Sequence, residues 1–477
     1  MKGSKNIDIP DTGGVRAIAM YLPQYHPIPE NDAWWGKGFT EWTNVRKGTP
    51  RFQGHYQPHV PGELGYYDLR TPDARIEQAE LAKRSGIFGF CYYHYWFNGR
   101  RLLERPLNEV IASKEPRFPF CVCWANENWT RRWDGRDRDV LMAQQYSDDD
   151  SLAFILDLLP AFRDERYIRV NGRPLLIIYR TSLLPDPKKT AEIWRETMIK
   201  AGVGEIYLVR VENFMHGSEP DPAEIGFDAA MEFAPYWEST GRKITNLARA
   251  GLPDIPLPDD LSVYDYERCM LEMMSRFQPA YTLFRGVFPA WDNTARRSTK
   301  STLFVNSSPE NFAFWLSRTV RQTCERYTGD ERLVFINAWN EWGEGCHLEP
   351  DEKYGRQYLD AVGMVLRQNE DHARLMEMRR SLHGMCTLSV GQWYEDMLDI
   401  YRDGRRLTKR DLRLLNAFNT LEDVASGDEE VVNRREQELL REKDEFINTL
   451  LNSSSWKVTK PMRKVMDTLR KLPGRNQ

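Results

Sequence analysis

The chain has 477 residues, of which 41% are hydrophobic and 29% are charged, and its formal net charge is −4. This length exceeds the size at which a single hydrophobic core keeps growing, so one large domain with additions is expected. The composition is that of a soluble globular protein. Because the net charge is small, it gives no general attraction to nucleic acid or to an anionic membrane, and no nucleic-acid partner is expected.

The seven cysteines show no pairing pattern and no metal-ligand spacing. Cys91, Cys121, Cys123 and Cys346 lie in apolar or aromatic segments, where a free cysteine behaves as a small buried hydrophobic residue. The first 14 residues lack the apolar run of a signal peptide, and no stretch approaches the roughly 20 apolar residues that cross a bilayer. These features predict a reducing, cytoplasmic location.

Eight short apolar runs recur along the chain, with helix-like segments between them. Near-continuous apolar runs of this length are typical of strands buried on both faces, as in parallel sheets. The predicted strands cover residues 15–25, 86–96, 118–124, 174–179, 206–211, 229–233, 284–291 and 333–339. The predicted helices cover residues 71–85, 147–162, 188–202, 264–277 and 309–327. Eight alternating units predict a closed (β/α)8 barrel, an α/β fold of the TIM-barrel type, over residues 1–370.

A doubly wound open sheet is the alternative fold. That fold usually carries a glycine-rich phosphate-binding turn directly after its first strand. Here the first strand runs into Pro23-Gln24-Tyr25-His26, and neither a GxGxxG nor a P-loop motif occurs. The pattern therefore favours the barrel.

The character of the sequence changes after about residue 370. Residues 371–431 are predicted to form a helical extension, and residues 432–477 a charged helix followed by a basic amphipathic tail. Between Trp456 and Gln477, seven Lys or Arg residues stand against one Asp, and apolar side chains recur at helical spacing. Such a tail predicts peripheral contact with the inner membrane, and docking on protein is the alternative.

Aromatic, amide and carboxylate residues follow the predicted strands. In a β/α barrel these positions meet at one end, where the active site forms. Aromatic faces pack against sugar rings and polar groups bind sugar hydroxyls, so the pattern predicts a carbohydrate site. The candidate substrate contacts are Tyr25, His26, Trp35, Glu41, Trp42, Tyr93, His94, Trp96, Trp124, Asn126, Glu127, Trp129, Glu212, Trp291, Asp292, Asn340 and Trp342.

Glu341 and Glu344 follow the eighth strand and are the candidate catalytic pair. Chemistry at a glycosidic bond usually needs two carboxyl groups, one of them held protonated. Neighbouring tryptophans and mutual repulsion are expected to raise the pKa of one of the two. The alternative for each is a structural ion pair with Arg131 or Arg132. Without HExxH, paired His or Cys ligands or a GxSxG elbow, no metal, cofactor or nucleophilic serine is predicted.

Four motifs carry a family resemblance: MYLPQYH at residues 20–26, GFTEWTN at 38–44, WANENW at 124–129 and WNEWGEG at 339–345. They resemble the WbsX-type, glycoside hydrolase family 99-like proteins of bacterial surface-polysaccharide clusters, over about residues 15–370. The resemblance implies a β/α barrel and kinship with endo-acting α-mannosidases that retain the anomeric configuration. It implies that Glu341 is the base for the sugar 2-hydroxyl and Glu344 the acid/base at the leaving oxygen. The chain departs from the pattern at Gly343, where the mannosidases are expected to carry His.

Together these features predict an enzyme of bacterial O-antigen, lipopolysaccharide or capsule metabolism. Its substrate would be an oligosaccharide or lipid-linked glycan of manno configuration, and the reaction a retaining glycosidase or transglycosidase step. One alternative is a nucleotide-sugar glycosyltransferase that holds a metal-bound diphosphate through Asp137 and Asp139 or through residues 148–150. A second alternative is a non-catalytic glycan-binding barrel.

Overall fold

The computed structural model describes residues 14–131, 136–212, 220–255, 257–297, 299–368 and 439–446. The chain divides into two units, Met1–Ala373 and Arg374–Gln477. In the second unit, residues 439–446 are helical. The rest of the predicted extension, including the tail from Trp456 to Gln477, lies outside the described residues, so the predicted domain boundaries stay predictions.

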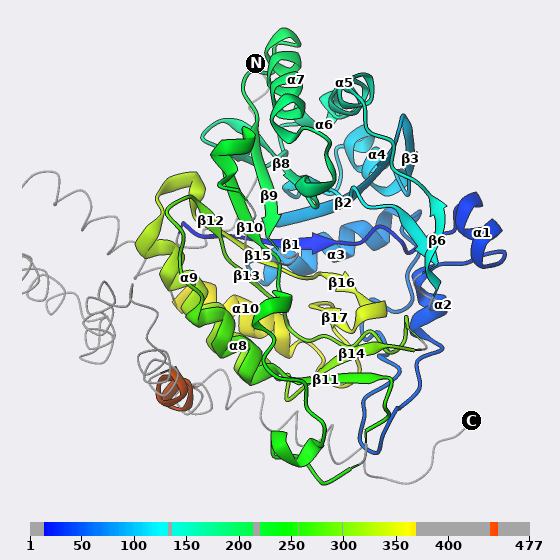
Figure 1. The fold of residues 1–477 in the computed structure, drawn as a ribbon, viewed down its shortest axis with the longest axis vertical. Helices are drawn as coiled ribbons and strands as arrows, with labels where there is room; N and C mark the ends of the chain where they lie inside the picture. Colours follow the sequence, from blue (N-terminus) through cyan, green and yellow to red (C-terminus); the bar gives the residue numbers. More distant parts are fainter. Residues whose placement is uncertain are drawn as a thin grey trace, which may run out of the picture. The chain divides into compact units, whose positions relative to one another are not determined.

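The first unit is built on a nearly closed barrel of parallel strands. Figure 1 shows these strands as arrows in the middle of the unit, with helices around them. Neighbouring strands pair in the order β1-β2-β4-β8-β9-β10-β12, and β13-β15-β1 completes the barrel. Because β12 and β13 are halves of one strand, the described residues form eight barrel strands, which confirms the (β/α)8 prediction. Their bounds are β1 Arg16–Tyr21, β2 Gly89–Phe97, β4 Phe120–Trp124, β8 Arg173–Ile178, β9 Tyr207–Glu212, β10 Ala229–Glu232, β12 Leu283–Phe284, β13 Gly286–Val287 and β15 Leu333–Ile336.

The seventh strand is the irregular one. Its first half pairs with β10 and its second half with β15, and Arg285 separates them. A Cβ on Gly286 would lie 2.1 Å from the carbonyl oxygen of Glu232, so a glycine is needed where the backbones approach at this closure. The prediction carried this strand to residue 291. The strand ends at Val287, and Trp291 instead accepts a backbone hydrogen bond of 2.9 Å from Phe304, outside the barrel ladder.

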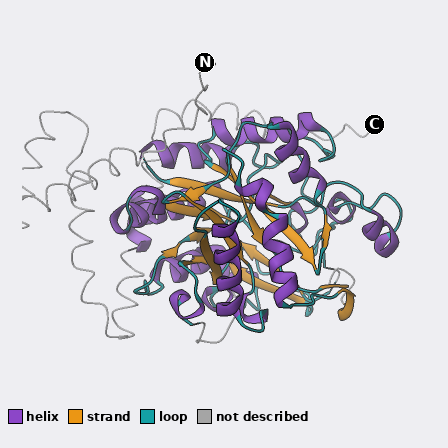
Figure 2. Ribbon diagram, turned by 90° about the horizontal axis from the view of Figure 1, so that it is seen from above, coloured by secondary structure: helices purple, strands orange, loops and turns teal. Residues whose placement is uncertain are grey.

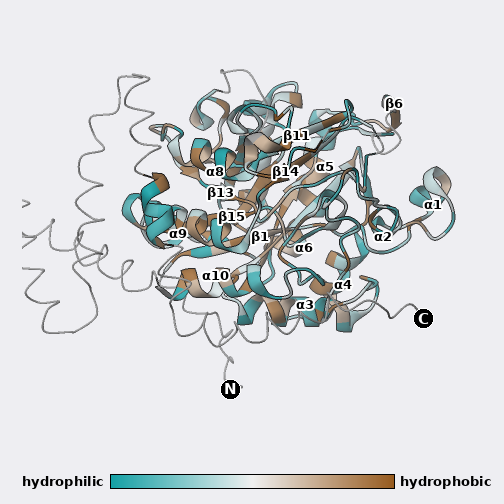
Figure 3. Cartoon of the chain, turned by 90° about the horizontal axis from the view of Figure 1, so that it is seen from below, coloured by the Kyte–Doolittle hydropathy of each residue, from teal (hydrophilic) through white to brown (hydrophobic). Residues whose placement is uncertain are grey.

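Helices surround the strands, as Figure 2 shows in purple and orange, and carry both hydrophilic and hydrophobic residues (Figure 3). The side chains of Ser147, Asp186 and Ser308 cap α5, α7 and α9 by accepting backbone N–H bonds. Helix α5 packs against α7, and α9 packs against α8 and α10. The helices are α1 Pro29–Trp35, α2 Glu41–Val45, α3 Pro72–Arg84, α4 Arg105–Ser113, α5 Asp148–Asp157, α6 Leu159–Phe162, α7 Pro187–Lys200, α8 Tyr266–Ser275, α9 Pro309–Arg326 and α10 Gln357–Gln368. Short 3-10 turns are η2 Thr181–Leu183, η3 Pro222–Ile225, η4 Trp237–Ser239, η5 Leu247–Ala250, η6 Gly329–Glu331 and η7 Trp342–Glu344.

Further strands decorate the barrel. Strands β3 and β7 pair with the barrel strands β2 and β8, and the pairs β5-β6, β11-β14 and β16-β17 form separate two-stranded sheets. The β11-β14 sheet has its own apolar cluster, which includes Leu247, Val263 and Leu303. Their bounds are β3 Arg100–Leu102, β5 Trp129–Arg131, β6 Arg136–Met142, β7 Arg169–Val170, β11 Leu261–Asp265, β14 Ser301–Val305, β16 Asn340–Glu341 and β17 Cys346–His347.

The cysteines of the barrel lie where the sequence pattern placed them. Cys91, Cys121, Cys123 and Cys346 are free and fully buried. Among the described residues, no helix combines the length and the apolar character that a bilayer crossing requires.

Candidate active site

Three carboxylates meet on one arginine at the mouth of the barrel. The Arg296 guanidinium pairs through Nε with Glu41, through Nη2 with Glu341 and through Nη1 with Glu344, each at 2.9 Å. Glu41 begins α2, after the first strand, while Glu341 and Glu344 follow the eighth. The structure therefore brings the predicted catalytic pair together with one predicted substrate contact.

Arg296 was missed by the sequence reasoning, which sought the partner of these glutamates in Arg131 or Arg132. The Arg131 guanidinium lies 5.2 Å from the Trp35 ring centroid, and Arg132 lies outside the described residues. The available signal was charge balance, because buried carboxylates need a cation beside them. The loop after the seventh strand offers such a cation five residues beyond Trp291.

The loop that carries Arg296 is anchored to β14. Asn293 donates its backbone N–H to the Thr302 carbonyl at 3.0 Å, and its side-chain oxygen accepts from the Thr302 N–H at 2.7 Å. The Asn293 carbonyl then accepts the N–H of Arg296 at 3.1 Å, which forms the turn that directs Arg296. The small β11-β14 sheet thus positions the cation of the site.

The loop that carries the two glutamates is fixed at its first residue. The Asn340 side chain accepts the Leu22 N–H at 2.7 Å and donates to the Leu22 carbonyl at 3.0 Å. The Tyr25 hydroxyl donates to the Asn340 carbonyl and accepts from the Trp342 N–H at 3.2 Å. Asn340, fully buried, and Tyr25 therefore act on the shape of this loop, although both were predicted as substrate contacts.

The electrostatics distinguish the two glutamates. Burial raises the pKa of Glu341 to about 8, with Arg296 acting against the shift and Glu344 and Glu41 adding to it. The Glu344 side chain retains 21% of its accessible surface, against 8% for Glu341. Burial opposes the charged form of Arg296, but the three carboxylates raise its pKa beyond its already high usual value. The site therefore combines a proton-binding buried carboxyl with a second, partly exposed one.

Gly343 stands between the glutamates because no side chain fits there. A Cβ at this position would lie 2.0 Å from Glu41 Oε1 and 3.1 Å from Arg296 Nε. Glu41 is fully buried, so its carboxylate has little room to move away. The absence of a side chain at residue 343 is thus coupled to the Glu41–Arg296 ion pair.

We expect Gly343→Ala to destabilise the chain by about 1–3 kcal/mol, the usual cost of overpacking. The added methyl must displace either Glu41 or Arg296. Urea unfolding measures the loss, and Glu41→Ala is the matched background because it removes the nearest clashing atoms. In that background Gly343→Ala costs less if the clash is responsible, whereas an equal cost in both backgrounds contradicts it.

An aromatic group supports the site from α2. Trp42 packs against Tyr25, Tyr67 and Trp342, with ring centroids 4.5, 5.1 and 5.6 Å away. Tyr93 and Tyr95, on β2, lie close enough to Glu341 for its charge to contribute, after burial, to their raised pKa values. Tyr95 is a further neighbour of the site outside the predicted set.

Other predicted contacts pack elsewhere. His94, Trp96 and Trp124 surround Phe154 of α5, with centroid distances of 5.8, 5.9 and 4.3 Å. The Trp96 indole N–H donates to Asp150 at 2.8 Å. Trp124 is 1% exposed. These three side chains thus lie between the barrel and α5 rather than around Arg296.

The loop after β4 carries a second cluster of polar side chains, which bind Arg180. Asn126 binds the backbone N–H and carbonyl of Arg180 at 2.8 and 2.9 Å, and Glu127 pairs with the Arg180 guanidinium at 2.7 Å. Trp129, on β5, packs 5.1 Å from the Tyr95 ring and 5.7 Å from the Trp34 ring. This hairpin therefore reaches the Glu341 side of the mouth through Tyr95.

His26 and the residues after the seventh strand lie in buried positions. His26 is 1% exposed, and burial lowers its pKa to about 4. Trp291 packs 5.4 Å from Trp237. The Asp292 carboxylate accepts from His55 at 2.7 Å, and its backbone N–H donates to the Glu344 carbonyl at 2.6 Å. Asp292 is thus adjacent to the loop that carries Glu341 and Glu344.

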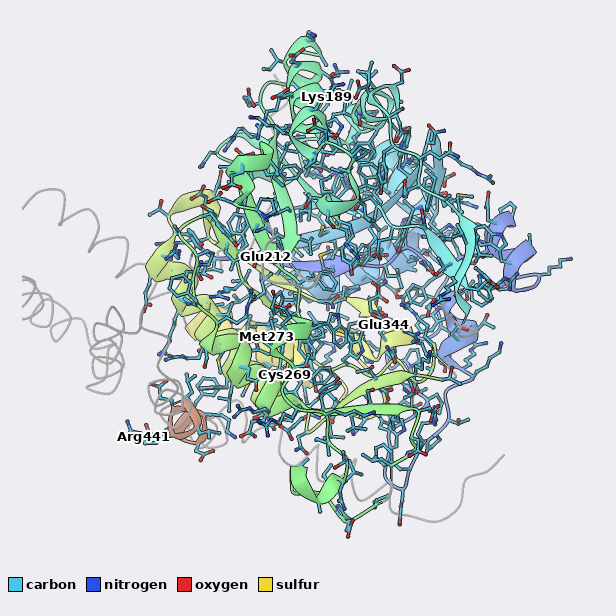
Figure 4. All side chains as sticks on the ribbon, viewed as in Figure 1. Lys189, Glu212, Cys269, Met273, Glu344 and Arg441 are labelled. Carbon is cyan, nitrogen blue, oxygen red and sulfur yellow. The ribbon has the colours of Figure 1, made fainter. Side chains whose placement is uncertain are left out.

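Glu212 lies apart from the Arg296 cluster, and Figure 4 shows it well separated from Glu344. It pairs with Arg210 at 3.0 Å and with Arg276 at 3.3 Å. Arg276 also pairs with Glu232, which Arg285 contacts at 2.9 Å. This ion-pair network is distinct from the three carboxylates on Arg296, and a role of Glu212 in substrate binding stays a prediction.

The fold and the site define a (β/α)8-barrel protein with paired carboxyl groups at the ends of its strands. The family model described as "Glycosyltransferase WbsX" matches residues 17–362. The chain therefore belongs to the WbsX glycosyltransferase family.

Two curated relatives are similar along most of the chain. An uncharacterized protein WxcX of Xanthomonas campestris pv. campestris strain B100 is 46% identical over 391 residues, 82% of this chain and 54% of the relative. The WxcX protein of strain ATCC 33913 is 46% identical over 395 residues, 83% of this chain and 55% of the relative. The chain spans about half the length of these relatives.

Solved structures of low sequence identity are also similar. The GH99 endo-alpha-mannosidase from Bacteroides thetaiotaomicron matches with a TM-score of 0.48 and 14% identity, over 75% of this chain and 98% of that one. A structure described as a glycoside hydrolase-like protein matches with a TM-score of 0.47 and 13% identity, over 77% of this chain and 97% of that one.

Proposed function

We propose that the chain is a carbohydrate-active enzyme that cleaves or transfers at a glycosidic bond through Glu341 and Glu344. The observation that carries the proposal is the shared ion pairing of both glutamates with Arg296. Two carboxyl groups of different exposure at one mouth suit proton transfer at two atoms of a bound sugar. The substrate would be a manno-configured oligosaccharide or lipid-linked glycan of a bacterial surface polysaccharide.

In the proposed first step Glu341 accepts the proton of the sugar 2-hydroxyl, and that oxygen attacks the anomeric carbon. The bond from the anomeric carbon to the leaving oxygen breaks, and Glu344 donates its proton to that oxygen. In the second step Glu344 accepts a proton from water or an acceptor hydroxyl, whose oxygen attacks the anomeric carbon. The bond to O2 then breaks, and Glu341 returns its proton to O2, so the configuration is retained and both glutamates are restored.

The raised pKa of Glu341 predicts the pH dependence. A base must be ionised to accept a proton, and Glu341 is ionised above its pKa of about 8. The same step needs a proton on Glu344, so the reactive pair carries one proton, which it loses as the pH rises above about 8. We therefore expect kcat/KM to fall above pH 8. The measurement is a kcat/KM profile from pH 5.5 to 9.5, and a profile that stays level from pH 8 to 9.5 would contradict the role of the pair.

The 2-hydroxyl step can be tested on the substrate. An oligosaccharide with 2-deoxy-2-fluoromannose at the cleaved position has no proton for Glu341 to remove, so we expect no turnover. The matched 3-deoxy-3-fluoro compound keeps the 2-hydroxyl and is expected to react. Comparable turnover of the two fluoro compounds would exclude participation of the 2-hydroxyl.

A nucleotide-sugar glycosyltransferase is the second candidate, because the family description names a glycosyltransferase. Two of the aspartates in the predicted diphosphate-binding stretch 148–150 have other partners in the structure. Asp150 accepts from Trp96, and Asp148 pairs with Lys189 at 2.6 Å at the start of α5. Calorimetry with nucleotide sugars and Mg²⁺ or Mn²⁺ distinguishes the candidates, since tight binding favours the transferase.

The proposed membrane contact rests on the sequence alone. Residues Trp456–Gln477 carry the basic amphipathic pattern and lie outside the described residues. Co-sedimentation of the chain with anionic vesicles, with and without this segment, tests the contact. A cytoplasmic location and a non-catalytic binding function likewise stay predictions.

A further inference from the structure

Three side chains of the types that bind metals lie close together next to Trp342, in the loop that carries Glu341 and Glu344. One ligand atom from each of His59, His347 and Asp351 lies within 4.8 Å of the other two, and all three residues are buried. His59 lies in the connection between α2 and α3, His347 ends β17, and Asp351 follows it. The proposed reaction uses none of them.

The hydrogen bonds of His347 show which of its ring nitrogens can bind a metal. The His347 Nδ1 atom lies 2.9 Å from the Glu349 carbonyl oxygen, which only accepts, so Nδ1 carries the proton and Nε2 is unprotonated. That Nε2 faces His59 Nδ1 at 2.9 Å. A ring N–H bonded to a backbone carbonyl is the usual support of a metal-ligating histidine. His347 therefore has the orientation of a metal ligand.

The charges of the group also suit a cation. Both histidines are buried, and neutral imidazole is the form that binds metals. Asp351 supplies a buried carboxylate, and Asp292 adds negative potential near His59. Lys353 and His55 face the same group and oppose the cation.

We propose that His59, His347 and Asp351 form a binding site for a divalent transition-metal ion such as Zn²⁺. Two imidazoles and a carboxylate are a common ligand set for such ions. For tetrahedral Zn²⁺ with metal–nitrogen bonds of about 2.05 Å, the two ligand nitrogens lie about 3.3 Å apart. His59 Nδ1 and His347 Nε2 are 2.9 Å apart, so a separation increased by about 0.4 Å would admit the ion.

The site would tie the catalytic loop to a distant segment. His347 stacks on Trp342, with ring centroids 3.7 Å apart and an angle of 15° between the planes. Trp342 lies between Glu341 and Glu344 in the chain. The two segments already meet through backbone bonds, Gly62 N–H to the Pro350 carbonyl at 2.8 Å and Glu352 N–H to the Val60 carbonyl at 2.9 Å. A metal here would be a structural crosslink beneath the glutamates.

The test uses the full-length, untagged chain after removal of metals with a chelator. We expect calorimetry to show one equivalent of Zn²⁺ bound. We also expect unfolding to shift upward by about 3–5 °C at a Zn²⁺ concentration about 100 times Kd. Co²⁺ in place of Zn²⁺ is expected to give visible absorption bands from nitrogen and oxygen ligation.

Two variants and a control identify the ligands. His59→Ala and the nearly isosteric Asp351→Asn are each expected to weaken Zn²⁺ binding at least 10-fold. His26→Gln removes another buried histidine and is expected to bind Zn²⁺ as the parent chain does. If the parent chain shows no binding and no Zn²⁺-dependent shift, His59 simply donates a hydrogen bond to His347 and the proposal is wrong. Equal binding by the parent chain and both variants would likewise overturn it. Should a variant fail to fold, the parent chain's stoichiometry, shift and Co²⁺ spectrum decide.

Discussion

Glu341→Gln and Glu344→Gln are each expected to lower kcat by about 10²–10⁴-fold while leaving the fold intact. The amide keeps the shape of the carboxyl but neither accepts nor donates the proton that each step moves. The measurement is kcat and kcat/KM on a manno-configured oligosaccharide, with thermal unfolding recorded in parallel. Turnover that stays near normal in both variants contradicts the proposed function.

The matched control for these variants is Glu63→Gln. Glu63 is a partly exposed carboxylate that pairs with Arg356 and lies outside the Arg296 cluster. The same chemical change there is expected to leave kcat unchanged. A similar loss in Glu63→Gln would mean that the assay reports stability rather than chemistry.

Arg296→Met is expected to lower the free energy of unfolding by about 3–5 kcal/mol at pH 9.0, where Glu341 of the parent chain is ionised. The variant leaves Glu41, Glu341 and Glu344 close together without their cation. Arg296 also acts to lower the pKa of Glu341, so its loss makes this carboxyl bind its proton more tightly. Protonation removes the buried charge, and the deficit is therefore expected to shrink as the pH falls.

Urea unfolding of the variant and the parent chain at pH 9.0 and pH 7.0, on either side of the Glu341 pKa of about 8, measures this dependence. The quantity compared is the difference between the two proteins at each pH, so effects common to both cancel. Arg296→Lys keeps one positive charge and is expected to lose less than Arg296→Met. An equal deficit for Arg296→Met at the two pH values would assign the loss to packing instead.

The barrel could be predicted because its strands carry a strong local signal. Runs such as residues 174–179 and 206–211 are apolar on both faces, and the structure places β8 and β9 there. The seventh strand was predicted too long because residues 288–291 are apolar enough for a strand. The backbone bond that Trp291 accepts from Phe304 of β14 depends on tertiary contacts that periodicity does not report.

The strand signal also made part of the site predictable, because it shows which residues follow each strand. Position after a strand selected Glu341 and Glu344 as candidates, and the structure places both on Arg296. Position alone does not tell which face of the strand a side chain occupies. Trp124 and His94 follow the same rule and pack against Phe154 on the outer side. Arg296 lies several residues beyond its strand, in a loop whose course is set by β14. Its role emerges only when the three carboxylates are in place.

Asn126 and Asn340 each make two side-chain hydrogen bonds to the backbone of one residue, Arg180 and Leu22 respectively. These bonds affect whether the loops after β4 and β15 can be replaced by loops from related barrels. Each side-chain amide satisfies one N–H and one carbonyl of a neighbouring backbone, as an adjoining strand would. Only an amide offers a donor and an acceptor in this spacing; an aspartate in its place can accept but not donate. A loop transplanted from a related barrel therefore needs an asparagine at the position of Asn340, where the loop begins. Insertions after this asparagine can alter substrate preference without moving the start of the loop.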